Sequence, residues 1–192
     1  MLNRHLFHAL ACVCLAAGLA RAAQVPRPAG EFTIDTLDGK GISLSQYKGK
    51  ICVLAFILTY CPHCQKTVGI LSTMQNEYGP RGLQVLASAI EDMARMKVPD
   101  FIANFKPTFP VGFNARDPVL EFLQHPAMFK LLMPQVVFID RKGVIRAQYA
   151  GDDTFITEDQ EKNIRGQIET LLKEAPAAPK KRSTPSASKK AP

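Results

Sequence analysis

The 192-residue chain carries 24 basic and 17 acidic residues, a formal net charge of +7 at pH 7. The excess lies at the two ends, because two basic residues precede Ala23 and five follow Glu174. The other 17 basic residues equal the acidic ones in number, so we expect a neutral globular domain. The sequence contains no internal repeat and no nucleic-acid-binding motif, which argues against a nucleic-acid partner.

Residues 1–22 have the pattern of a secretory signal peptide. Arg4 precedes an apolar stretch (residues 9–20) without acidic residues, and Ala20-Arg21-Ala22 offers a cleavage site before Ala23. The apolar stretch is shorter than a permanent transmembrane helix, so cleavage is favoured over a retained anchor. We therefore predict an exported protein in the periplasm or another extracytoplasmic space, where disulfides form and persist.

The rest of the chain divides into three parts. Residues 23–30 form a Pro-containing leader, and residues 31–174 are long enough for one domain with a hydrophobic core. Residues 175–192 contain Ala, Pro, Ser and Lys without a large apolar residue, which predicts a disordered basic tail. The tail could touch an anionic membrane or cell-wall surface weakly, although a solvated extension is the simpler interpretation.

The first half of the domain predicts a hairpin followed by a parallel strand–helix–strand unit. Residues 32–37 and 42–44 are short strands separated by the turn at residues 38–41. The unbroken apolar run at residues 51–58 predicts a strand buried on both faces. Val68, Leu71 and Met74 recur at helical spacing, and residues 83–87 form the next buried strand.

The second half predicts helices alternating with one further hairpin. In chain order these elements are a helix over 93–105 interrupted at Pro99, an extended piece at 109–111, a helix capped by Asp117, strands at 133–140 and 144–149, and a helix over 157–172 capped by Thr157. The order predicts an α/β fold, with helices packed on a mixed sheet.

Cys61-Pro62-His63-Cys64 lies where the buried strand ends and the first helix begins. Unpaired N–H groups at a helix N-terminus favour a thiolate, and Pro62 suits the first helical turn. A histidine beside Cys61 stabilises the same thiolate. Cys64, one turn further on, is shielded. The pattern predicts Cys61 as the nucleophile and Cys64 as the resolving thiol of a redox-active pair.

Two other uses of a cysteine pair are less consistent with the sequence. A zinc site needs a second pair of ligands, and the mature chain offers only Cys52 and scattered histidines. A structural disulfide at this spacing would constrain the unfolded chain little. Cys52 lies inside the buried strand and is interpreted as a small core residue. We therefore expect no metal and no cofactor besides the Cys61–Cys64 disulfide.

Taken together, these features resemble the thioredoxin superfamily, and more narrowly its TlpA/ResA-like redoxin branch of periplasmic thiol-disulfide oxidoreductases. Besides the cysteine pair, the likeness rests on residues 32–40, Gly49-Lys50, Met133-Pro134, and Phe138-Ile139-Asp140 with Gly143. It covers residues 31–172. The resemblance implies a thioredoxin-like fold with an N-terminal hairpin and a central helical insertion.

The resemblance also implies roles for residues outside the motif. Pro134 should have a cis peptide bond next to the disulfide, which leaves the backbone of Met133 free to pair with a substrate segment. Tyr60 stands where relatives usually have Trp and keeps an aromatic shield. The implied partners are protein thiols and disulfides, together with a membrane thiol reductase or oxidase that exchanges electrons with a monomeric protein.

Departures from the family pattern leave the direction of electron flow open. Thr67 and Gly69 stand where many TlpA/ResA-like reductases have Glu and Pro, and the missing Glu removes a candidate proton acceptor. The Cys-Pro-His-Cys sequence is similar to that of DsbA-type oxidases, in which a stabilised thiolate makes the disulfide more oxidising. The chain is too short for the helical insertion of DsbA. Glu91 and Asp92 could supply a carboxylate, but a solvated loop end is the simpler prediction.

Two alternative functions use the same fold. A peroxiredoxin needs Thr or Ser three residues before its reactive cysteine, where this chain has Leu58, with Thr59 one residue out of register. A copper chaperone would bind Cu(I) through the soft thiolates and a distant histidine. Such proteins normally separate their cysteines by three residues, and His125 is the only histidine that follows His63.

Overall fold

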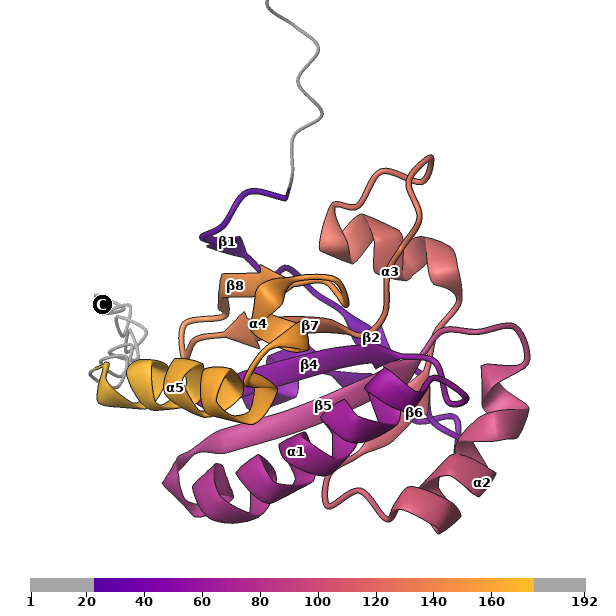
Figure 1. The fold of residues 1–192 in the computed structure, drawn as a ribbon, viewed down its shortest axis with the longest axis horizontal. Helices are drawn as coiled ribbons and strands as arrows, with labels where there is room; N and C mark the ends of the chain where they lie inside the picture. The colour runs from indigo at the N-terminus through magenta and orange to yellow at the C-terminus, as the bar shows by residue number, and fades with distance from the viewer. Residues whose placement is uncertain (1–22, 175–192) are drawn as a thin grey trace, which may run out of the picture.

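A six-stranded mixed sheet forms the centre of the computed structural model, which describes residues 23–174 (Figure 1). The strand order is β1-β8-β7-β4-β5-β6. These strands are β1 (Arg27–Pro28), β4 (Ile51–Ile57), β5 (Leu83–Ala89), β6 (Val111–Phe113), β7 (Gln135–Ile139) and β8 (Val144–Tyr149). The predicted signal peptide and basic tail lie outside the described residues.

A small second sheet and the helices surround this centre. The second sheet pairs β2 (Thr33–Ile34) with β3 (Ile42–Ser43). The helices are α1 (Pro62–Tyr78), α2 (Ala94–Phe105), α3 (Arg116–Leu123), α4 (Thr154–Thr157) and α5 (Gln160–Lys173), with short 3₁₀ turns η1 (Leu44–Tyr47) and η2 (Gly79–Arg81). Within residues 23–174, none of the helices combines the length and the apolar character needed to cross a membrane.

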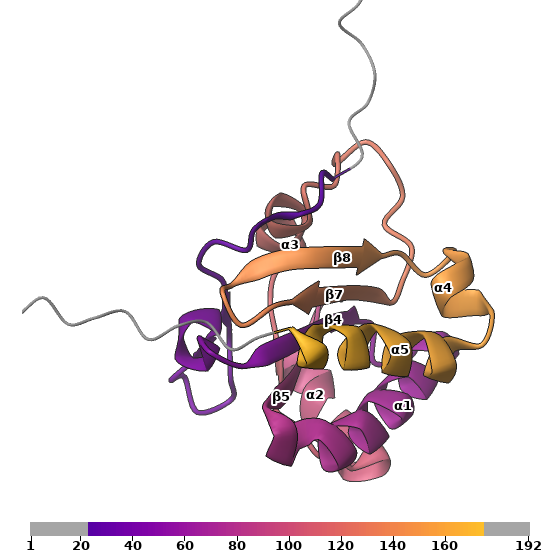
Figure 2. The ribbon, with the colours of Figure 1, turned by 90° about the vertical axis from the view of Figure 1, so that its left-hand side faces the viewer.

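The central strand β4 is buried along its whole length, as its apolar sequence predicts. It runs parallel to β5 and antiparallel to β7. Because side chains alternate along a strand, Val53 and Ile57 face one hydrophobic core and Leu54 and Phe56 the other. Helices α1 and α5 cover the first face, and α3 lies behind the sheet in Figure 2. Each fully buried large apolar side chain contributes about 1.5–3 kcal/mol to folding.

Most predicted elements are confirmed: the N-terminal hairpin, β4, α1, the parallel β5 and the β7–β8 hairpin. The predicted α/β class with a mixed sheet is therefore correct. The extended piece expected at residues 109–111 is present two residues later, as β6.

The predicted interruption at Pro99 is wrong, because α2 continues through this residue. Proline removes one backbone hydrogen bond from a helix interior. Val98 and Phe101 are both buried, whereas Pro99 is exposed. Burial of the inner face of α2 outweighs the missing bond.

Two predicted helix caps are also wrong. Asp117 lies inside the first turn of α3, after the N-cap Ala115, where its charge still interacts favourably with the helix dipole. Thr157 ends α4 and does not cap α5. Asp153 starts α4 by accepting a 2.8 Å hydrogen bond from the Phe155 N–H, and Asp159, with φ of 45°, redirects the chain into α5. The helix expected over residues 157–172 is confirmed as α5, which begins three residues later, and the preceding α4 was not predicted.

The predicted leader contributes a strand that the sequence did not reveal. Residues 27–28 form β1 and pair with β8 at the sheet edge. Proline is tolerated in such an edge strand because the missing N–H can face away from the ladder. The Arg27 guanidinium fixes this strand by donating to the Phe122 carbonyl at 3.0 Å and to the Gln148 side chain at 2.8 Å.

Candidate active site

The cysteine pair lies at the junction between β4 and α1. Cys61 is the N-cap of α1, and its carbonyl accepts the first helical hydrogen bond, from the Gln65 N–H at 3.0 Å. Cys61 is partly exposed, whereas the Cys64 side chain is completely buried one helical turn further on, and both are free thiols. An incoming sulfur atom can therefore reach Cys61 but not Cys64.

Burial determines the protonation of Cys64. Removal from solvent raises the pKa of the Cys64 thiol well above its ordinary value, and the nearby Cys61 and Glu91 raise it further. The Leu58 N–H donates to Cys64 Sγ at 3.4 Å and acts in the opposite direction. Desolvation is the largest of these effects, so Cys64 keeps its proton at neutral pH.

Glu91 follows β5 and is bonded to the loop that carries the cysteines. Its Oε1 atom accepts hydrogen bonds from the Thr59 N–H, at 3.1 Å, and from the Thr59 hydroxyl. Its Oε2 atom is buried and has no hydrogen-bond partner among residues 23–174. The sequence favoured a solvated loop end, which is wrong for Glu91 but right for the exposed Asp92.

Met133 and Pro134 lie next to the end of β4. The Met133–Pro134 peptide bond is cis, as the resemblance implied, and so is Val25–Pro26. Phe56 pairs with Gln135 in the antiparallel β4–β7 ladder. The residue after Phe56, Ile57, therefore lies beside the residue before Gln135, Pro134. Pro134 is buried, and Met133 packs against both hydrophobic cores. The structure thus brings Met133 and Pro134 to the end of β4 at which the cysteines also lie.

The other residues predicted for the site are on its surface. Pro62 and His63 in the first turn of α1 are exposed, and Tyr60 just before them is 69% exposed. Met93, which follows Glu91 and Asp92, is also largely exposed. His125 lies elsewhere, in the loop after α3, with Nδ1 3.0 Å from the Pro126 carbonyl oxygen.

A buried polar contact that the sequence did not reveal lies behind the cysteines. Thr67 is completely buried, and its hydroxyl donates to the His63 carbonyl at 2.8 Å. The Gln160 side chain, also buried, donates to the same hydroxyl at 2.7 Å. Gln160 is 93 residues away in sequence, and no local motif marks such a partner.

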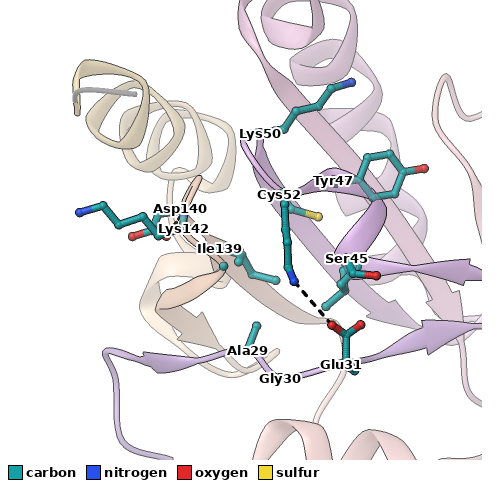
Figure 3. Close-up of a pocket in the computed structure, with 13 residues that line it drawn as sticks. Ala29, Gly30, Glu31, Ser45, Tyr47, Lys50, Cys52, Ile139, Asp140 and Lys142 are labelled. Carbon is teal, nitrogen blue, oxygen red and sulfur yellow. Dashed lines mark hydrogen bonds and ion pairs between the residues drawn. The ribbon is translucent and has the colours of Figure 1, made fainter. Parts of the chain in front are cut away.

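A cavity of about 220 Å³ at the opposite end of β4 is separate from this site (Figure 3). Cys52 contributes to its wall together with Ser45 and Ile139, and an ion pair joins Lys48 to Glu31 at 3.8 Å. Burial raises the pKa of the Cys52 thiol to about 12, so this thiol is neutral and unreactive at ordinary pH. The interpretation of Cys52 as a core residue is confirmed.

Comparisons with known proteins identify the family. The model of the AhpC/TSA family matches residues 25–148. The chain belongs to the AhpC/TSA family. Among its curated relatives is the thiol-disulfide oxidoreductase ResA of Geobacillus kaustophilus, which is 27% identical over 143 residues, 74% of this chain and 78% of that protein. ResA of Bacillus thuringiensis subsp. konkukian is 23% identical over 131 residues, 68% of this chain and 72% of that protein.

Solved structures confirm the thioredoxin-like fold. A thioredoxin family thiol:disulfide interchange protein from Chlorobium tepidum TLS has a TM-score of 0.64 at 21% identity, covering 78% of this chain and 98% of that one. A secreted disulfide oxidoreductase from Mycobacterium tuberculosis has a TM-score of 0.58 at 19% identity, covering 73% and 96%. The resemblance found in the sequence is thus supported by family, relatives and fold.

Proposed function

We propose that this protein is an exported thiol-disulfide oxidoreductase that exchanges a Cys61–Cys64 dithiol or disulfide with protein thiols. The observation that carries the proposal is the unequal exposure of the two sulfur atoms at one helix N-terminus. Cys61 is accessible to a partner, and Cys64 is completely buried one turn behind it. The relatives named as thiol-disulfide oxidoreductases support the same activity.

The exchange takes two steps in the reducing direction. The Cys61 thiolate attacks one sulfur of a substrate disulfide, a mixed disulfide forms, and the first substrate thiolate leaves and takes up a proton. Cys64 then loses its proton and attacks Cys61 Sγ, which releases the second substrate thiolate. The products are a Cys61–Cys64 disulfide and a substrate dithiol, so two electrons pass to the substrate. The reverse sequence oxidises a substrate dithiol.

The residues around the pair have distinct parts in this scheme. The N-terminus of α1 stabilises the Cys61 thiolate, Pro62 starts the helix, and His63 adds a positive or hydrogen-bonding group on the exposed side. The Met133 backbone, held by Pro134, pairs with an extended substrate segment. Tyr60 offers an exposed aromatic surface beside the nucleophile.

The proposal of export rests on the sequence of residues 1–22, which has the charge, apolar length and Ala-x-Ala site of a cleaved signal peptide. A monomer in the periplasm or a similar compartment would then recover its working redox state from a membrane thiol reductase or oxidase. No cofactor besides the disulfide takes part in this chemistry.

The peroxidase and copper-chaperone alternatives find less support. The residue three positions before Cys61 is Leu58, and the neighbouring Thr59 hydroxyl is engaged with Glu91. His125 lies in the loop after α3, where its ring is close to the Pro126 carbonyl. The peroxidase alternative therefore lacks a free hydroxyl three residues before Cys61, and the copper-chaperone alternative lacks a distant histidine beside the cysteine pair.

Trapping of a mixed disulfide tests the proposed function. With a disulfide-containing protein substrate, Cys61→Ala should abolish exchange, whereas Cys64→Ala should accumulate a covalent mixed disulfide visible on a non-reducing gel. Cys52→Ala is the matched control and should exchange like the wild type, because Cys52 lies at the other end of β4. Exchange that survives Cys61→Ala, or no adduct with Cys64→Ala, would refute the proposal.

A further inference from the structure

We propose that Glu91 is the proton acceptor for Cys64 in the resolving step, with Thr59 as the residue that positions its carboxylate. This inference rests on the proposed thiol-disulfide exchange and assigns one step of it. It answers a chemical need of the site: a completely buried thiol must lose its proton before it can attack the mixed disulfide.

Consecutive residues of one loop hold the sulfur and the carboxylate. The Leu58 N–H donates to Cys64 Sγ at 3.4 Å, and the next N–H, of Thr59, donates to Glu91 Oε1 at 3.1 Å. The ends of β4 and β5 are joined at the same level by a 3.1 Å hydrogen bond from the Ile90 N–H to the Ile57 carbonyl. Glu91 is thereby held by the residue that follows the one bonded to Cys64 Sγ.

The second carboxylate oxygen of Glu91, Oε2, makes no hydrogen bond within the described residues. Thr59 supplies both hydrogen bonds to Oε1, while Oε2 is buried without a partner. Leaving a buried acceptor unpaired destabilises the folded protein, and more so for a charged group. No hydrogen bond joins Oε2 to Cys64 Sγ in the described residues, so the proton passes through one bridging water, which is within the reach of a general base.

The electrostatic environment agrees with this geometry. The titratable groups that act on Cys64 are Cys61, on the same helix, and Glu91, from the end of β5, and both raise the pKa of the Cys64 thiol. Asp92 is exposed, and Thr67 stands at the position where the resemblance implies a glutamate. Glu91 is therefore the carboxylate positioned to take the proton.

The resolving step forms one sulfur–sulfur bond and breaks another. In the mixed disulfide, Cys61 Sγ is bonded to a substrate sulfur. Glu91 takes the proton from Cys64 through the bridging water, the Cys64 sulfur forms a bond to Cys61 Sγ, and the bond from Cys61 to the substrate sulfur breaks. The electron pair of that bond leaves with the substrate thiolate, which is protonated by solvent. Glu91 then returns its proton to solvent, or to Cys64 when the reaction runs backwards.

A symmetric aromatic disulfide with a coloured thiolate can separate the two steps. Attack by Cys61 releases one coloured thiolate, and attack by Cys64 on the mixed disulfide releases the second, so stopped-flow absorbance should show two phases. Glu91→Gln should slow the second phase by about 10- to 100-fold near neutral pH and leave the first unchanged. The deficit should shrink at higher pH, where hydroxide removes the Cys64 proton.

The sign of the effect separates proton transfer from a purely electrostatic role. Because the Glu91 charge raises the pKa of Cys64, removal of that charge alone would speed the second phase. Asp92→Asn, which removes the neighbouring exposed carboxylate, is the matched control and should behave like the wild type. A second phase that Glu91→Gln leaves unchanged, speeds, or slows equally at every pH would overturn the inference.

Thr59→Val provides a second variant if Glu91→Gln does not fold. It keeps the carboxylate but removes the hydroxyl that holds Oε1, so it should slow the second phase by a smaller factor. A wild-type second phase in this variant would refute the positioning role. If the wild-type protein itself showed no second phase, or Cys64→Ala kept one, the proposed function would fail instead.

Discussion

The Gln160 side chain donates a 2.7 Å hydrogen bond to the hydroxyl of Thr67, and both side chains are buried between α5 and α1. The Thr67 hydroxyl in turn donates to the carbonyl of His63, inside the Cys61–Cys64 motif. A polar chain thus runs from the C-terminal helix to the turn that carries the cysteines. Buried networks of this kind favour one arrangement of the helices over others.

Thr67→Val should destabilise the protein by about 1–3 kcal/mol, because it leaves the buried Gln160 amide without its acceptor. Urea unfolding measures this difference. Thr73→Val is the matched control on the same helix: its hydroxyl also bonds to the carbonyl four residues earlier, but it is exposed. The control should change the unfolding free energy by less than about 0.5 kcal/mol. Equal losses in the two variants would contradict this account.

Gly151→Ala should disturb the segment that contains Met133 and Pro134. A Cβ atom at Gly151 would lie 2.3 Å from the Met133 carbonyl oxygen and 3.0 Å from its nitrogen, so the backbone must move. We expect a loss of about 1–3 kcal/mol in stability and slower exchange with protein substrates. Urea unfolding and an exchange assay measure the two effects.

Gly166→Ala is the control for Gly151→Ala. Gly166 lies in α5, and a Cβ atom there would meet no other atom within 4 Å. Alanine favours a helix by about 1 kcal/mol over glycine, so this variant should be more stable and exchange normally. Unimpaired exchange by Gly151→Ala would show that the Met133 backbone takes no part in substrate pairing.

Much of the fold can be predicted from the sequence, because its strongest signals are local. The continuous apolar run of β4 and the helical spacing of Val68, Leu71 and Met74 place Cys61 at a helix N-terminus without any knowledge of tertiary structure. The same local logic predicts the β7–β8 hairpin around Gly143, whose φ is 79°.

The remaining features depend on contacts between distant residues or on competing local signals. Thr59 meets Glu91 across 32 residues, and no periodicity marks that pair. Thr157 followed by Gln160 matches a helix-capping pattern. In the structure, however, Asp153 is the N-cap of α4 and Asp159 is the N-cap of α5. Strand β1 has two residues, too few for an alternating pattern.

The buried Cys52 thiol predicts how stability depends on alkaline pH. The pKa of Cys52 is raised from 9.0 to about 12 in the folded protein. Between pH 9 and pH 12 the unfolded chain therefore binds fewer protons than the folded protein does. Its contribution to stability is complete below pH 9 and is lost as pH rises through 12, at about 1.4 kcal/mol per pH unit. Urea unfolding of the reduced protein should show a shallower alkaline decline for Cys52→Ala than for the wild type. Identical declines would contradict the assignment.

The most direct test of the central claim is a redox titration of the mature protein in glutathione or dithiothreitol buffers, with free thiols counted at equilibrium. We predict one two-electron transition that disappears in both Cys61→Ala and Cys64→Ala and remains in Cys52→Ala. A midpoint of about −120 to −180 mV would indicate oxidase or isomerase chemistry, and one below about −250 mV a reductase. Absence of any two-electron transition, or its persistence without Cys64, would contradict a redox-active Cys61–Cys64 pair.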